Sequence, residues 1–364
     1  MRKLIWIPIV IIAVGIVALL VGFANGGLKS LSIDRGGVHV EGSGSGNLIT
    51  VDETYPGYKS IDIEADYFDH ITLKEGDSFS VHGQNYESYG GLNVKLDGDT
   101  LKVDAKRHGK WLNFGIDKLM GNTANDSWLE ITWPKDTSLD SVQLNIGVSR
   151  INAADIDCKE LSIEDAFGNI DVSTVKCGSL TLKAASGKVG LNGADVSGNA
   201  VVNDSFGDVT LSGVTADTLN AELSSGKLSA GNVSAATLTV SNNFGKIDVN
   251  NAEADSMTLK LNSGDLSATG VKAGGLTVNS DFGKVSIDRL DFTGLCTIKN
   301  NSGDVTLGLL VDENSLSYDL NADAGSVWVD NMKSDKSVTS RVPGALANLS
   351  VHADFGSIHV NFPA

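Results

Sequence analysis

The sequence predicts an all-β fold: a single-stranded parallel β-solenoid of about 19 residues and three short strands per coil, with a β-rich capping portion and a transmembrane helix before it. Three observations predict it. The 364 residues include 41 Gly and only 5 Pro, a composition typical of many short strands and tight turns. A Phe-Gly or Ser-Gly dipeptide recurs at nearly fixed intervals, and a long apolar run opens the chain.

The apolar run covers residues 4–24 and follows Arg2 and Lys3. About 20 uncharged apolar residues are enough to cross a bilayer as a helix. Basic residues before such a helix stay in the cytoplasm, so we expect a single-pass cell-membrane protein whose C-terminal domain is extracellular. The alternative is a secreted protein cleaved near Ala24, because "GFA" resembles a signal-peptidase site.

The dipeptides define a repeat whose steps are 19 or 20 residues. We call the residue before the glycine the corner residue of its coil. The clear corner residues are Phe167, Ser186, Phe206, Ser225, Phe244, Ser263, Phe282 and Ser302.

Apolar residues fall in three pairs around each corner residue, six and four before it, three and five after it, and eight and ten after it. Spacing by two is the period of a strand with one buried face. The pairs of the Phe282 coil are Leu276 and Val278, Val285 and Ile287, and Leu290 and Phe292.

The same register continues at both ends of the clear repeats. Val148 is a corner residue before them, and Ala324 and Phe355 follow them with residues 331–348 inserted between. We predict four parts. Residues 1–24 contain the cytoplasmic basic pair and the anchor or signal, and residues 25–46 form a Gly/Ser-rich tether. Residues 47–140 form the β-rich cap, and residues 141–364 form the solenoid repeats.

The net charge limits the partners. The net charge of the chain is −17. Without Arg2 and Lys3, 26 basic and 45 acidic residues remain, and the net charge is −19. This sign argues against nucleic acid and offers no polybasic patch for anionic lipid. We expect a cell-wall or host-surface polymer or an envelope protein as the partner, and contact with the membrane through residues 4–24.

The repeats leave no room for an enzyme's active-site loops. All six histidines lie outside residues 141–308, and the calcium-binding nonapeptide motif is missing from the sequence. We therefore predict no enzyme, no catalytic, cofactor-binding or metal-binding residues, and no cofactor. Residues two after the corner residue alternate in charge, which predicts a surface ion-pair ladder. They are Asn169, Lys188, Asp208, Lys227, Lys246, Asp265, Lys284 and Asp304.

Two cysteines occupy the same place in consecutive coils. Cys158 and Cys177 are 19 residues apart, so their Cα atoms should lie about 5 Å from each other, within reach of a disulfide. The alternative is that both are small core residues, like Cys296, and the sequence favours neither.

The phenylalanine corner residues are candidates for a ligand surface. Phe occupies every second coil and Ser the coils between, so the rings would be about 9.6 Å apart. We favour rings that point inward and pack against the small residues, and the alternative is an exposed row that binds a ligand. The rings are those of Phe167, Phe206, Phe244 and Phe282.

A second candidate is the basic and aromatic segment 106–128. Trp111 and Phe114 lie beside four basic residues there and could bind a glycan or an anionic polymer. The favoured alternative is a cap in which these aromatic side chains are buried.

The strand that ends in "WPKD", followed by units such as "LTLKAASGKVGL" and "LKLNSGDLSATG", resembles the bacterial "putative adhesin" β-strand-repeat family over roughly residues 50–364. The resemblance implies an exported or single-pass envelope protein with a domain of unknown function and no catalytic residues.

The function predicted is a membrane-tethered, extracellular, non-enzymatic solenoid that acts as an adhesin-like or cell-envelope interaction protein. The alternative is an accessory or structural protein associated with envelope stress or signalling. A polysaccharide-active β-helix enzyme is a distant third.

Overall fold

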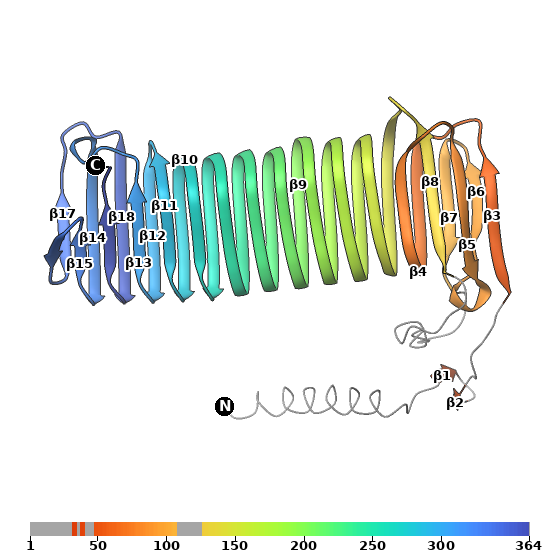
Figure 1. Ribbon diagram of the computed structural model, residues 1–364, viewed down its shortest axis with the longest axis horizontal. Helices are drawn as coiled ribbons and strands as arrows, with labels where there is room; N and C mark the ends of the chain where they lie inside the picture. Colours follow the sequence, from red (N-terminus) through yellow and green to blue (C-terminus); the bar gives the residue numbers. More distant parts are fainter. Residues whose placement is uncertain (1–30, 35–36, 41–46, 108–125, 364) are drawn as a thin grey trace.

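The protein is an all-β, solenoid-like stack of coils (Figure 1). The computed structural model describes residues 31–34, 37–40, 47–107 and 126–363. Within these ranges no helix has the length and apolarity needed to cross a bilayer. The predicted anchor, residues 4–24, lies outside them.

The strands are numbered along the chain. Their bounds are β1 Leu31–Asp34, β2 Gly37–Val40, β3 Leu48–Thr54, β4 Ser60–Gly76, β5 Ser80–Tyr86, β6 Asn93–Asp97, β7 Thr100–Ala105, β8 Trp128–Pro134, β9 Ser138–Ser263, β10 Leu266–Phe282, β11 Val285–Phe292, β12 Leu295–Ser302, β13 Val305–Leu309, β14 Leu316–Ala324, β15 Val327–Val329, β16 Met332–Ser334, β17 Ser337–Ser340, β18 Ala347–Phe355 and β19 Ile358–Asn361. Two short 3₁₀ turns, Glu87–Tyr89 and Glu313–Ser315, interrupt them. Strands β1 and β2 pair antiparallel within the predicted tether.

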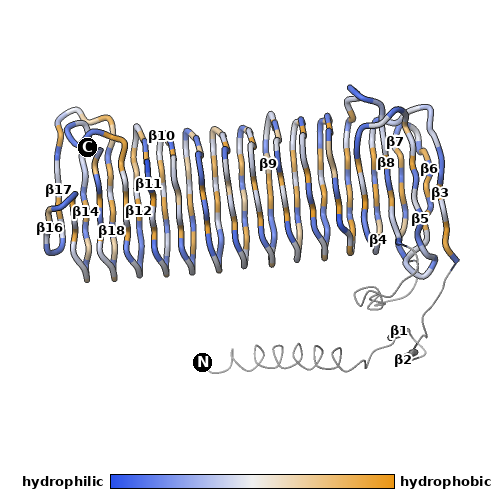
Figure 2. Tube along the Cα trace, viewed as in Figure 1, coloured by the Kyte–Doolittle hydropathy of each residue, from blue (hydrophilic) through white to orange (hydrophobic). Residues whose placement is uncertain are grey.

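Consecutive coils pair in parallel, and the offset is the one that the repeat predicts. Leu266 of β10 lies beside Ile247 of β9 on one side and Val285 of β11 on the other, each 19 residues away. The three apolar pairs are buried, and hydropathy alternates along every coil in Figure 2. Unlike the three short strands predicted, β9 runs unbroken for 126 residues, because the coils stay paired through the bends.

The bend after the second apolar pair uses left-handed backbone, seven residues after the corner residue. Non-glycine residues there have φ between 51° and 55°, and glycines take the same place in other coils with φ between 62° and 67°. This conformation is unfavourable for most side chains, and Asn, Asp and Gly tolerate it best. The non-glycine residues are Asp155, Thr174, Asn232, Asn251 and Arg289.

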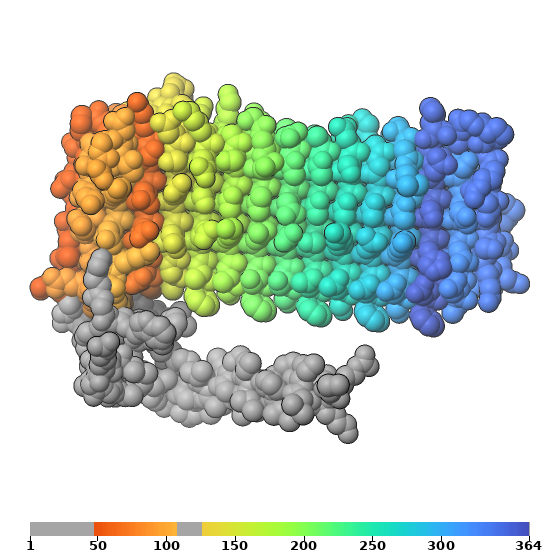
Figure 3. All heavy atoms as spheres, turned by 180° about the vertical axis from the view of Figure 1, so that it is seen from behind, coloured from red at the N-terminus to blue at the C-terminus, as the bar shows by residue number. Residues whose placement is uncertain are grey.

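At the N-terminal end the chain order and the spatial order differ. Strand β4 forms a coil of the stack, with Ile61 beside Val142 and Tyr67 beside Val148 of β9. The later strands β7 and β8 pair in parallel with the other edge of β4. Figure 3 shows the redder coil of β4 between orange and yellow ones. Antiparallel strands β6 and β5 then cover β7 and β8, and β3 covers β5.

The C-terminal end repeats this interleaving. Strand β18 lies between β12 and β14, and β19 lies between β13 and β15. The last coil of the sequence is therefore inside the stack, seen as the darkest blue band between paler ones in Figure 3. The sequence register places the Phe355 coil after the Ala324 coil, and in space it comes before. Antiparallel strands β17 and β16 close the end by pairing with β14 and β15, so parallel stacking stops there.

Candidate ligand-binding edge

The phenylalanine rings of the corner residues point outward, so the favoured inward packing is wrong. Each of these phenylalanine residues has between 51% and 68% of its surface exposed, whereas the apolar pairs are buried. We call these five residues the phenylalanine row: Phe167, Phe206, Phe244, Phe282 and Phe355.

A buried polar side chain inside the bend accompanies four of the five outward rings, whereas Ala353 takes this place before Phe355. The residue two before the corner residue is buried, and in three coils its Oδ1 accepts the N–H of the phenylalanine at 3.2 Å. These are local Asx turns, which fill the inner corner and leave the ring outside. The three residues are Asp165, Asp204 and Asn242.

The two aspartates of these turns carry a carboxylate oxygen without a partner. Oδ2 of Asp165 and of Asp204 is buried and makes no hydrogen bond, whereas Nδ2 of Asn242 donates to the carbonyls of Gly226 and Lys246. Burial raises the pKa of Asp165 to about 7, although backbone N–H groups act against the rise, and burial also raises the pKa of Asp204.

Interleaving adds the fifth ring of the row. Phe355 of β18 pairs with Ser302 of β12 on one side and with Ala324 of β14 on the other. In space an aromatic corner residue thus alternates with a small one up to this end. The sequence shows "DFG" at Phe355, but its distance from Ser302 along the chain hides the alternation.

The glycine after each corner residue lets the coils stack closely. From Gly187 onward these glycines have φ between 126° and 158° in the regular coils, and a Cβ on Gly245 would overlap the carbonyl oxygen of Gly226 one coil away. Only glycine fits such a position. The close stack holds the corner residues in one line.

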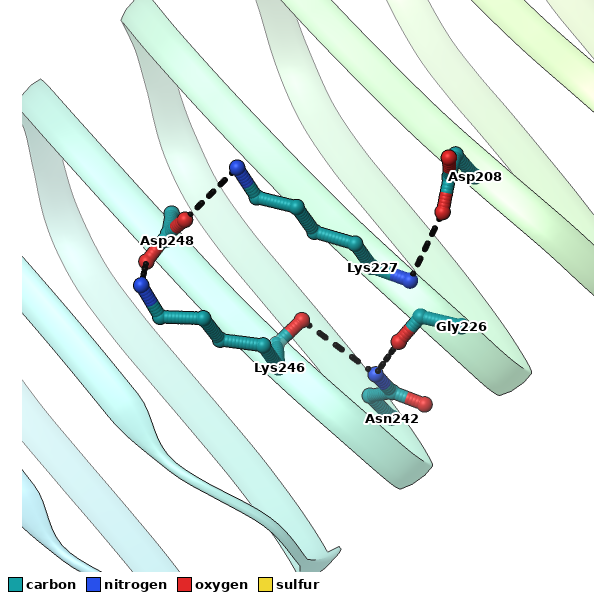
Figure 4. A network of polar contacts seen from close by, with 6 residues as sticks. All are labelled: Asp208, Gly226, Lys227, Asn242, Lys246 and Asp248. Carbon is teal, nitrogen blue, oxygen red and sulfur yellow. Dashed lines mark hydrogen bonds and ion pairs between the residues drawn. The ribbon is translucent and has the colours of Figure 1, made fainter.

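The charged residues beside the row do not form the predicted ion-pair ladder. Oδ1 of Asp208 accepts the backbone N–H of Lys227 in the next coil at 3.1 Å, and Asp265 does the same for Lys284 at 3.0 Å. The ammonium groups of Lys227 and Lys246 instead reach Asp248, at 2.9 and 2.7 Å (Figure 4). Burial would raise the pKa of Asp248, but these two lysines outweigh it and lower the pKa.

The other predicted site residues are not brought to the row. Trp111 and Phe114 lie outside the described residues, so their role stays a prediction. Cys158 and Cys177 are buried free thiols in contact, and their hydrogen bond and burial raise the pKa of Cys158. Their bridge stays a prediction. Burial alone raises the pKa of Cys296 to about 12.

Among the residues that the structure describes, one cluster of metal-ligating side chains lies near Phe355, where the sequence predicts no metal. The ligand atoms of Asp323, His352 and Asp354 are within 4.8 Å of one another. Nε2 of His352 is 2.8 Å from Asp354, and Nδ1 is 3.2 Å from Asn321. The cluster is partly exposed, and both ring nitrogens of His352 already have polar partners. These side chains therefore satisfy one another without a metal ion.

A family model covers nearly the whole described stack. The Toastrack DUF4097 model matches residues 58–233 and 201–361. The chain belongs to this family. The resemblance to a domain of unknown function is thereby confirmed. No functionally curated protein matches the chain.

The solved structures that match the chain are distant from it. A "putative adhesin" from Bacteroides fragilis is 13% identical, with 87% of this chain and 98% of that one covered and a TM-score of 0.29. A "putative lipid binding protein" from Parabacteroides distasonis is also 13% identical, with 74% and 98% covered and a TM-score of 0.36.

Proposed function

We propose that the chain is a membrane-tethered, non-enzymatic protein of the cell surface that binds a surface polymer through the phenylalanine row. The row carries this proposal. Leaving large apolar side chains in water forgoes the free energy of burial, and a regular line of them is typical of a binding surface. The hydrogen-bonded stack keeps the corner residues in place, so binding costs little ordering entropy.

The tether is supported by the sequence. Arg2 and Lys3 before the apolar residues 4–24 favour a cytoplasmic N-terminus and an extracellular stack. Cell fractionation followed by N-terminal sequencing tests it. A retained Met1 in the membrane fraction supports the anchor, and a mature N-terminus near Asn25 in the medium contradicts it.

Cosedimentation with isolated cell walls tests the binding function. The full-length protein in detergent should sediment with the walls, and the triple variant Phe206→Ser/Phe244→Ser/Phe282→Ser should not. Leu346→Ser is the matched control, because it removes another exposed apolar side chain, 85% exposed, away from the row. Equal sedimentation of wild type and triple variant would reject the row as the binding surface.

A further inference from the structure

The spacing of the row sets the repeat of its ligand, an inference that rests on the proposed function. Paired strands are about 4.8 Å apart, so rings in alternate coils recur at about 9.6 Å. The pairings of Phe355 with Ser302 and Ala324 keep this interval at the C-terminal end. Five rings therefore give four equal intervals, roughly 38 Å in total.

The rings are separate stacking surfaces and do not merge into one apolar strip. Between them lie the half-buried Ser186, Ser225, Ser263 and Ser302, each followed by a glycine. A lipid surface favours continuous apolar cover with basic residues around it. Isolated rings at a fixed interval instead match a polymer that presents one flat apolar face per repeat.

The side chains beside the rings favour an uncharged, hydroxyl-rich partner. Carboxamides precede three of the corner residues, at Asn243, Asn262 and Asn301, and Asn262 Nδ2 donates to Asn243 Oδ1 at 3.0 Å. Both lysines and aspartates occur two residues after the corner. This mixture of hydrogen-bond donors and acceptors, with charges of both signs, suits hydroxyl and acetamido groups. The net charge of −17 disfavours a polyanion.

We infer that the phenylalanine row binds an extended β-1,4-linked glycan, with one disaccharide for every two coils. Successive sugars of such a chain are turned over, so the same apolar C–H face recurs once per disaccharide, a distance close to the interval of the row. Each ring then stacks on every second sugar. The flanking carboxamides hydrogen-bond to the polar edges of the chain.

A polyproline II peptide has a similar repeat, about 9.3 Å per turn. Peptides of this kind dock into grooves lined by aromatic side chains. The row fits them less well, because each of its phenylalanine residues is more than half exposed.

Isothermal titration of the full-length protein with chitin oligosaccharides of two, four, six and eight sugars tests the inference. Each added disaccharide covers one more ring, so the affinity should rise at each step by about two- to tenfold, the factor that aromatic stacking gives. An affinity that does not change between four and eight sugars overturns the match of repeats.

A spacing variant provides the sharper test. Phe206→Ser/Ser225→Phe keeps five rings but moves one of them by one coil, and Phe244→Ser/Ser263→Phe is a second version should the first fold poorly. Either should bind the octasaccharide about two- to tenfold more weakly than wild type. Phe206→Tyr, which keeps the ring in place, should bind like wild type. A spacing variant that folds and binds like wild type refutes the inference.

The outcomes separate the ligand class from the proposed function. If no oligosaccharide binds but row-dependent sedimentation with cell walls persists, the glycan is wrong and the proposed function stands. Binding of a proline-rich decapeptide, or self-association detected by light scattering and lost in the triple variant, would then identify the other occupant. If the wild-type protein neither binds an oligosaccharide nor sediments with cell walls, both proposals fail.

Discussion

Replacing Asp165 by Asn should make the protein more stable at alkaline pH and remove part of its pH dependence. The carboxyl is buried, its Oδ1 accepts the N–H of Phe167 at 3.2 Å, and its Oδ2 has no partner. At the equivalent place Asn242 donates its amide to two backbone carbonyls, at 2.9 and 3.3 Å. A protonated Asp165 can make such a bond and a charged one cannot.

The magnitude follows from the pKa of Asp165, which burial raises from 3.8 to about 7. A pKa that is higher in the folded state stabilises the fold fully below the unfolded value, and this stability is lost as pH rises through the folded value. At about 1.4 kcal/mol per pH unit, the loss between pH 4 and pH 8 is about 4 kcal/mol. About 3 kcal/mol of it falls between pH 5 and pH 8.

Urea denaturation followed by circular dichroism at pH 5, 6, 7 and 8, at constant ionic strength, measures the effect. The free energy of unfolding of Asp165→Asn minus that of wild type should increase by about 3 kcal/mol over this range. Asn242→Asp is the reverse control and should acquire a loss of stability with rising pH. A difference between Asp165→Asn and wild type that stays constant with pH would refute the reasoning.

Four other predictions address the stack and the row. Gly245→Ala should lower the free energy of unfolding by more than about 2 kcal/mol, while Gly231→Ala, whose Cβ meets only open space and one distant carbonyl, should change it by less than about 0.5; equal effects in a denaturation assay contradict the close stacking. Phe206→Ser should change the unfolding free energy by less than about 0.5 kcal/mol, since the residue is 63% exposed; a large loss in the same assay would mean that the ring is packed. Mild oxidation should link Cys158 to Cys177 and leave Cys296 free, as seen by non-reducing peptide mass spectrometry; complete alkylation of all three thiols speaks against the bridge. Deleting residues 345–364 should expose residues 310–340 to proteolysis while β9 stays protected, in contrast to deletion of residues 362–364 alone; protection of both segments would contradict the interleaved order.

The coil could be predicted from the sequence because its signal is local and repeated. Each apolar pair keeps the same distance from a Phe-Gly or Ser-Gly dipeptide, and residues such as Leu276 and Val278 are buried as predicted. The register of β4 could not be seen, because one shift between Tyr67 and His70 moves its second apolar pair by one residue. Without that shift, the buried pair Ile71 and Leu73 would lie three and five residues after the corner position, and the sequence would have identified β4 as a coil.

The sequence contained a signal for the outward direction of the rings, in the residue two before the corner residue. Polar residues precede phenylalanine by two in Asp165, Asp204 and Asn242, whereas apolar ones precede serine in Leu223 and Leu261; Asn300 before Ser302 and Ala353 before Phe355 are exceptions. Where it holds, this pattern places an Asx turn in the phenylalanine coil and an apolar side chain at the same place in the serine coil. The spatial neighbours of Phe355 had no such signal, because parallel coils accept one another in any order when their apolar pairs match.

The position of β18 and β19 inside the stack also orders its assembly. During synthesis from the N-terminus, β14 and β15 emerge before the coil that must separate them from β12 and β13. They cannot take their final places until residues 347–361 have been delivered. The C-terminal segment is thus the last to take its place in the stack. A chain that ends before it would leave the strand edges of β12 and β13 unpaired.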